Sequence, residues 1–221
     1  MHHLATVFAA FCESSFDLEH RVIYDYHSLP VCIIDCVYSL RARYETITLP
    51  VVQRYADHCM NGDPNAAGDT LSSFLARVDA IGENAFAQEI LRNRQLTGGR
   101  PKIAVCRQLA HYLQLLHIDT LDDFRNYEAP ELVEAVIRAV KGIGSAGTHY
   151  LFMLTGDENR CKPDVHIHCC IRDACGHDLP DDECQQLFTD TIALLHARHP
   201  ALTCRDLDAI IWSAYAGGHQ A

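Results

Sequence analysis

The stretch from Val133 to Leu154 constrains the fold more than any other part of the chain. Apolar residues recur at i, i+3, i+4 and i+7 from Val133 to Val140, which is the spacing of an amphipathic helix. Gly142-Ile143-Gly144 interrupts the pattern, and apolar spacing resumes after it. Two glycines around one apolar residue permit a tight turn, and free amides at the following helix start can bind a phosphate. We therefore predict a helix, a glycine hairpin and a second helix. A glycine cap followed by an unrelated helix is the simpler alternative.

Asp164 lies twenty residues after Gly144, in the segment Lys162 to Ile167. The hairpin together with this spaced aspartate resembles the helix-hairpin-helix DNA glycosylase superfamily of endonuclease III-like enzymes, over about residues 29–171. The resemblance implies a two-lobed helical DNA glycosylase fold with a helix-hairpin-helix motif and an interlobe cleft. One lobe would span residues 28–158 and end in the hairpin; residues 1–27 and 159–221 would form the second. Periodicity independently predicts an all-α protein, because no stretch alternates with a period of two.

The resemblance also implies a chemistry. Excising a base breaks the N-glycosidic bond, and positive charge develops on the sugar while the base leaves. A carboxylate near C1′ stabilises that charge and orients a water, once the base has been rotated into a pocket. The resemblance makes Asp164 the catalytic residue; its type and position also suit the N-cap of a helix starting at Val165, and the two roles are compatible. Bifunctional members carry a lysine two residues after the second glycine, where this chain has Ala146. We therefore expect a monofunctional enzyme that leaves an abasic site.

Backbone contacts at the hairpin are implied by position. The amides expected to bind DNA phosphate are those of Gly142, Gly144 and Ala146. The carbonyls expected to coordinate a monovalent cation, Na⁺ or K⁺, are those of Arg138, Val140 and Ile143.

Two basic segments are further candidates for DNA contact. In Thr97 to Lys102, two glycines precede Arg100 and Lys102 at a predicted helix start, which suits a phosphate contact as well as an ordinary loop. Arg41 falls where the family places a residue that fills the gap left by the flipped base; a cation on a solvated helix end is the alternative.

The eleven cysteines bear on cofactors. A chain of 221 residues without an export signal favours reduced thiols, most of them in the core. The spacing of the iron–sulfur cysteines of endonuclease III is missing, so we expect no such cluster and no required cofactor. His166 to Cys184 is dense in possible zinc ligands, but it has no C-x2-C pair, and core packing is the favoured interpretation.

Charge and hydropathy narrow the possible partners. The net charge of −11 predicts weak nonspecific DNA binding, and no apolar run reaches the roughly 18 residues of a membrane span. We expect a cytoplasmic, soluble monomer acting on double-stranded DNA with a damaged or modified base, in repair or in defence against phage DNA with hypermodified bases. The alternatives are a catalytically inactive helix-hairpin-helix module that binds DNA or protein, and a zinc-dependent regulator.

Overall fold

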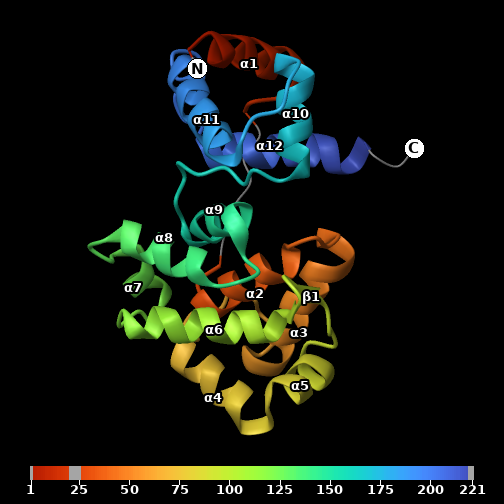
Figure 1. Ribbon diagram of the computed structural model, residues 1–221, viewed down its shortest axis with the longest axis vertical. Coiled ribbons are helices and arrows are strands. Elements are labelled where there is room, and N and C mark those ends of the chain that lie inside the picture. The colour runs from red at the N-terminus through yellow and green to blue at the C-terminus, as the bar shows by residue number, and fades with distance from the viewer. Residues whose placement is uncertain (1, 20–25, 219–221) are drawn as a thin grey trace. The chain divides into compact units, whose positions relative to one another are not determined.

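The computed structural model describes residues 2–19 and 26–218, and most of these lie in helices (Figure 1). The all-α prediction is therefore confirmed. The chain divides into two compact units: unit 1 is residues 1–24 with 156–221, and unit 2 is residues 25–155. The expected lobe boundaries, 28 and 158, each lie three residues from those of the units. Within the described ranges, no helix is both long and apolar enough to cross a membrane.

Unit 2 is built around α2 (Leu29–Ser39), whose eleven residues are all buried. A helix that is apolar on every side belongs in the interior, and α2 packs against α3 (Leu49–Cys59), α6 (Lys102–Leu115) and α9 (Gly144–Thr155). Its start is set locally, because the Ser28 side chain accepts a hydrogen bond from Val31 N–H at 3.3 Å and a proline occupies the first turn.

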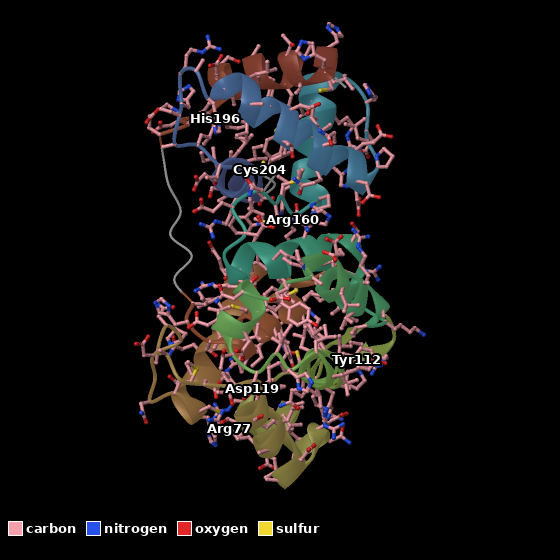
Figure 2. All side chains as sticks on the ribbon, turned by 90° about the vertical axis from the view of Figure 1, so that its left-hand side faces the viewer. Arg77, Tyr112, Asp119, Arg160, His196 and Cys204 are labelled. Carbon is pink, nitrogen blue, oxygen red and sulfur yellow. The ribbon has the colours of Figure 1, made fainter. Side chains whose placement is uncertain are left out.

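The remaining elements of unit 2 surround this centre. They are a π-helical turn η1 (Tyr44–Thr48), α4 (Leu71–Ile81), α5 (Glu83–Ala85), a second π-helical turn η2 (Phe86–Ile90), β1 (Leu96–Thr97), β2 (Arg100–Pro101), α7 (Leu121–Arg125) and α8 (Pro130–Ala139). Asp119, labelled in Figure 2, lies just before α7 and contacts the start of α4. Its carboxylate accepts a hydrogen bond from Ser72 N–H at 2.7 Å. Thr120 and Asp123 then form a capping box that starts α7.

Unit 1 contains α1 (His2–Ser15), α10 (Val165–Cys175), α11 (Asp181–Leu195) and α12 (Cys204–Gly218). Helix α1 packs on α11, where the rings of Phe8 and Phe188 have their centroids 5.6 Å apart. The helix begins at His2 because Ala5, Phe8 and Cys12 form an apolar stripe that unit 1 buries.

Candidate functional site

The predicted helix, glycine turn and helix are present in unit 2 as α8 and α9. Gly142 and Gly144 have φ angles of +113° and +70°, which L-residues rarely adopt, so the turn requires glycine at both positions. Ile143 between them is buried, whereas Gly144 is exposed with no atom within 4 Å of the place where a Cβ would stand. The first amides of α9 therefore begin at an open surface.

Gly147 holds this turn against the central helix. A Cβ here would lie 2.7 Å from Ile143 Cγ2 and 3.2 Å from Leu40 Cδ2, so only glycine allows α9 to approach so closely. The Cys36 thiol, on α2, donates to the Gly147 carbonyl at 3.1 Å. The hairpin is thus fixed to the most buried helix of unit 2.

A second glycine turn packs directly on the hairpin. Residues 97–100 form a tight β-turn between β1 and β2, and Thr97 Oγ1 donates to Gly142 O at 2.7 Å. A Cβ on Gly98 would stand 2.9 Å from Gly142 Cα, so the two backbones touch. Arg100 reaches the same turn, with its guanidinium 3.5 Å from the Lys141 carbonyl and also bonded to Gln108. We call residues 97–100 and 141–144 the double-glycine surface.

This surface lies in the least acidic part of the chain. No Asp or Glu occurs between Ile90 and Ile118, or between Ala135 and Gly156. Unit 2 as a whole has 12 Lys and Arg against 15 Asp and Glu, and unit 1 has 6 against 14, so most of the net charge of −11 belongs to unit 1. An anionic ligand would therefore meet far less repulsion at the double-glycine surface than the total charge suggests.

The expected phosphate contact by Lys102 is wrong in this structure. Lys102 is 1% exposed, and its ammonium donates to Tyr38 O at 2.9 Å, Leu40 O at 2.8 Å and Gln95 Oε1 at 3.0 Å. A buried ammonium must be hydrogen-bonded, and the unsatisfied carbonyls at the end of α2 supply the acceptors. Lys102 therefore fixes the backbone immediately before Arg41, which is exposed and has a φ of +53°.

The other hairpin residues keep their predicted places. Ala146 is half-buried in the first turn of α9, and Arg138 lies in the last turn of α8. The Val140 carbonyl accepts a hydrogen bond from Ile143 N–H at 3.3 Å, which leaves it a second lone pair. This geometry is compatible with a cation at the Arg138, Val140 and Ile143 carbonyls, and that site stays a prediction.

Asp164 belongs to unit 1, whereas the hairpin belongs to unit 2. It is the N-cap of α10: its carboxylate accepts from His166 N–H at 2.9 Å and from Ile167 N–H at 3.3 Å. The N-cap position predicted as compatible with catalysis is thus present. Two amide donors and the helix N-terminus favour a negative charge at this point.

Sequence reasoning missed two residues of α12 that lie beside this cap. Asp208 is 4% exposed and accepts from Lys162 N–H at 2.6 Å. Burial, and secondarily the charge of Asp164, raise the pKa of Asp208 to about 8. Trp212, one turn further, places its ring edge-on to His166 with centroids 6.1 Å apart. In the sequence, the one sign of this site was an acidic residue, Asp208, on the apolar face of the last predicted helix.

A buried polar cluster in unit 2 was also missed. Asp35 is 0% exposed in the middle of α2, and its carboxylate accepts from the hydroxyls of Tyr26 at 2.9 Å, Tyr44 at 2.7 Å and Tyr150 at 2.9 Å. Burial, followed by the charge of Asp35, raises the pKa of Tyr26 and of Tyr44. In the sequence, the sign of this cluster was an acidic residue, Asp35, inside an otherwise apolar helix. The three phenols satisfy the carboxylate and tie α2 to its neighbours.

The Cys and His residues after Asp164 take different places in the fold, although the His168 ring and the Cys184 thiol lie 3.9 Å apart. Cys170 lies in the core of unit 1, and His168 bridges the carboxylates of Asp178 at 2.7 Å and Asp181 at 3.1 Å. All eleven cysteines are free thiols. Across residues 2–19 and 26–218, no three His, Cys, Asp or Glu side chains are grouped to hold a metal ion.

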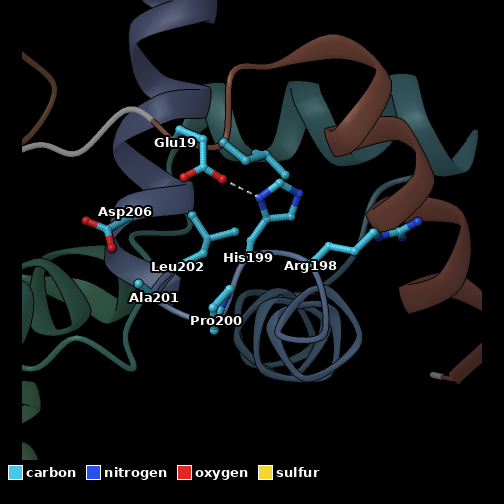
Figure 3. Close-up of a pocket in the computed structure, with 8 residues that line it drawn as sticks. Glu19, Arg198, His199, Pro200, Ala201, Leu202 and Asp206 are labelled. Atoms are coloured by element: carbon cyan, nitrogen blue, oxygen red, sulfur yellow. Dashed lines mark hydrogen bonds and ion pairs between the residues drawn. The ribbon is translucent and has the colours of Figure 1, made fainter.

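Figure 3 shows a small pocket of about 140 Å³ in unit 1, lined by residues 18–19, 198–202 and Asp206. Its polar groups are engaged with one another. His199 Nδ1 lies 2.8 Å from Glu19 Oε1, and Asp206 accepts from the Thr203 hydroxyl at 2.7 Å in the cap of α12. None of the residues predicted to contact DNA or to act in catalysis lines it.

The class that these features define is an all-α protein with a glycine hairpin and an aspartate-capped helix. The chain belongs to the family described as Domain of unknown function (DUF8548), whose model matches residues 6–216. No curated protein and no solved structure matches the chain.

Proposed function

We propose that this protein is a monofunctional DNA glycosylase of the helix-hairpin-helix type, with unit 2 and unit 1 corresponding to the two lobes of such an enzyme. The observation that carries the proposal is the glycine hairpin combined with Asp164. The hairpin has the left-handed glycines and open helix start that a phosphate site needs, and Asp164 is a half-buried carboxylate at a helix N-terminus twenty residues later.

In the proposed reaction, DNA phosphates are bound by the amides of Gly142, Gly144 and Ala146 together with Arg100. A monovalent cation at the hairpin carbonyls would add positive charge there. Arg41, held outward by a left-handed turn that Lys102 anchors, fills the gap left by the extruded base. These contacts hold the duplex while one nucleotide is flipped out of the stack.

Asp164 then acts at the sugar. Its carboxylate stabilises the positive charge that develops at C1′ as the base departs, and it orients the attacking water. The hydrogen bonds that it accepts from two amides of α10 keep this carboxylate in place without rearrangement during the reaction. The products are the free base and an unbroken strand with an abasic site.

The proposed substrate is double-stranded DNA with a damaged or modified base, encountered in the cytoplasm. Base excision repair and attack on hypermodified phage DNA are both compatible with this chemistry. The concentration of acidic residues in unit 1 favours low nonspecific affinity, which suits an enzyme that must ignore most of the DNA it meets.

Asp164→Asn tests the proposal. Asparagine is an equally good N-cap, so the fold and most DNA binding should persist, while excision should fall at least a hundredfold because the charge at C1′ is lost. We would screen duplexes with single modified bases, and phage genomic DNA, for base release. Asp190→Asn on α11 removes the same charge elsewhere in unit 1 and should retain wild-type turnover. Turnover of Asp164→Asn within a few-fold of wild type would refute the assignment.

One observation favours the second candidate, an inactive helix-hairpin-helix module that binds DNA or protein. The two hydrogen bonds that Asp164 accepts from backbone amides are those of an ordinary helix N-cap, and an N-cap role alone would explain an aspartate at this position. A module of this kind would bind duplex DNA, or a protein partner, and release no base from any substrate in the screen.

A further inference from the structure

We propose that Asp208 is a positioning residue for Asp164: its buried carboxyl group carries a proton at neutral pH and holds the turn that presents Asp164. The catalytic meaning of this arrangement rests on the proposed glycosylase function, whereas the protonation of Asp208 does not.

The first argument is the geometry of the segment that presents Asp164. Asp208 Oδ1 accepts from Lys162 N–H at 2.6 Å, and Asp164 N–H in turn donates to Lys162 O at 2.7 Å. Lys162, Pro163 and Asp164 therefore form one tight turn that is attached at its start to the Asp208 carboxyl group. Loss of that acceptor would leave a partly buried amide without this hydrogen bond and release the turn.

The helix that carries Asp208 is itself held at this segment. Thr203 and Asp206 cap α12 reciprocally, with Asp206 N–H donating to Thr203 Oγ1 at 3.0 Å. Arg205 N–H donates to Glu158 O at 3.1 Å, and its guanidinium pairs with the Glu158 carboxylate at 3.0 Å. The start of α12 and residues 158–164 are thus joined at several points, so Asp208 meets the Asp164 turn in a fixed register.

The second argument is electrostatic. Two neighbouring carboxyl groups in a poorly solvated place cannot both ionise without a large cost. The proton is held by the group with fewer donors and less solvent: Asp208 has the Lys162 amide and is almost wholly buried, whereas Asp164 has two amides and a helix N-terminus. The elevated pKa of Asp208, about 8, agrees with a proton held there at neutral pH.

The other groups around Asp208 do not change this assignment. The Lys162 amide, and secondarily the Lys162 charge, lower the pKa of Asp208, but more weakly than burial and Asp164 raise it. Burial raises the pKa of the Cys161 thiol, and raises that of Cys204 to about 12, so both thiols are neutral in the same range. Asp208 therefore adds no charge beside Asp164 at neutral pH and adds one negative charge above about pH 8.

A direct test follows the carboxyl carbons of the full chain by NMR. The signal lost in Asp208→Asn should titrate near pH 8, far above the ordinary value of 3.8, and its midpoint should fall in Asp164→Asn because the neighbouring charge is gone. Titration near 4, or a midpoint unaffected by Asp164→Asn, would overturn the protonation of Asp208 beside Asp164.

The catalytic part is tested by pH–rate profiles on a substrate duplex. Wild type should lose activity above about pH 8, where a second charge repels Asp164. Asp208→Leu, which cannot accept the Lys162 amide, should lower kcat at least tenfold with little change in KM. Asp208→Asn, which mimics the protonated acid, should recover most of that loss at pH 7 and lack the alkaline decline.

Asp190→Asn on α11 serves as the matched control, because it removes a carboxylate that accepts a hydrogen bond from Gln186 elsewhere in unit 1, and it should keep the alkaline decline. If that decline persists in Asp208→Asn, the positioning role is wrong while the glycosylase stands. If wild type releases no base at all, the proposed function and the positioning role fall together, and the NMR titration alone decides the protonation of Asp208.

Discussion

At the scale of single residues, burial separates two cations that the sequence presents as equivalent. Arg100 and Lys102 are two positions apart, yet Lys102 binds three oxygens inside unit 2 while Arg100 lies half-buried against the hairpin. The same positive charge therefore stabilises the fold in one case and remains available to a ligand in the other.

Replacing Lys102 by Met should lower the free energy of unfolding by about 2–4 kcal/mol, because the Tyr38 and Leu40 carbonyls lose their donor inside the protein. Urea unfolding measures this. The salt dependence of DNA binding should be unchanged. A smaller slope of log affinity against log salt would show that Lys102 contacts phosphate after all.

Arg100→Ala should do the opposite. It should leave the unfolding midpoint nearly unaltered and reduce the slope of log affinity against log salt by about one unit, since one phosphate contact is lost. Arg107→Ala is the control, because Arg107 is a cation of unit 2 paired with Asp79 at 2.8 Å and should not alter the slope. Equal slopes for Arg100→Ala and wild type would show that Arg100 makes no phosphate contact and that the β-turn only connects β1 to β2.

At the scale of elements, contact between two turns forms the candidate DNA surface. Gly98 and Gly99 both have positive φ angles, +56° and +78°, but only a Cβ on Gly98 would meet the hairpin, at 2.9 Å from Gly142 Cα. Alanine substitutions at these two glycines therefore separate two effects. Both introduce backbone strain, but only the one at Gly98 disturbs the packing of one turn on the other.

Gly98→Ala should weaken duplex binding about tenfold, because the hairpin backbone must shift to admit the methyl group. Gly99→Ala should cost only the strain of a left-handed alanine, about 1–2 kcal/mol of stability, with affinity within a few-fold of wild type. Fluorescence anisotropy at fixed salt, with thermal melts of each variant, makes the comparison. The same loss of affinity in both variants would show that contact with the hairpin does not matter for binding.

At the scale of the whole molecule, the uneven charge of the two units reconciles an acidic protein with an anionic ligand. The acid-free segments 91–117 and 136–155 both belong to unit 2, and the double-glycine surface draws its residues from them. A local surface of this kind supports binding at low salt even though the total charge is −11.

The reaction product is a property of the complete enzyme, and it should be an intact strand with an abasic site. Strand cleavage requires an amine that attacks C1′ and persists as a Schiff base, and the methyl group of Ala146 cannot supply one. Strand breaks should appear only after mild alkali, and borohydride should trap no covalent complex. A trapped adduct that disappears in Lys141→Ala or Lys162→Ala would contradict the monofunctional assignment.

The sequence by itself determined the helices and the turns that end them. Apolar spacing and the positions of glycine and capping residues predicted α8, α9 and the start of α10, because these signals act within a few residues of the backbone they shape. They also placed Gly142, Gly144 and Asp164 in the local geometry that the structure has.

Tertiary structure alone decided which groups meet. Gly98 touches Gly142, Lys102 binds Tyr38 and Leu40, and Asp208 holds the Asp164 turn across forty or more positions of sequence. A local pattern fixes the face on which a side chain lies, but not what lies opposite it. Burial and hydrogen-bond partners come from that opposite side, and they made Lys102 structural and Asp208 a partner of Asp164.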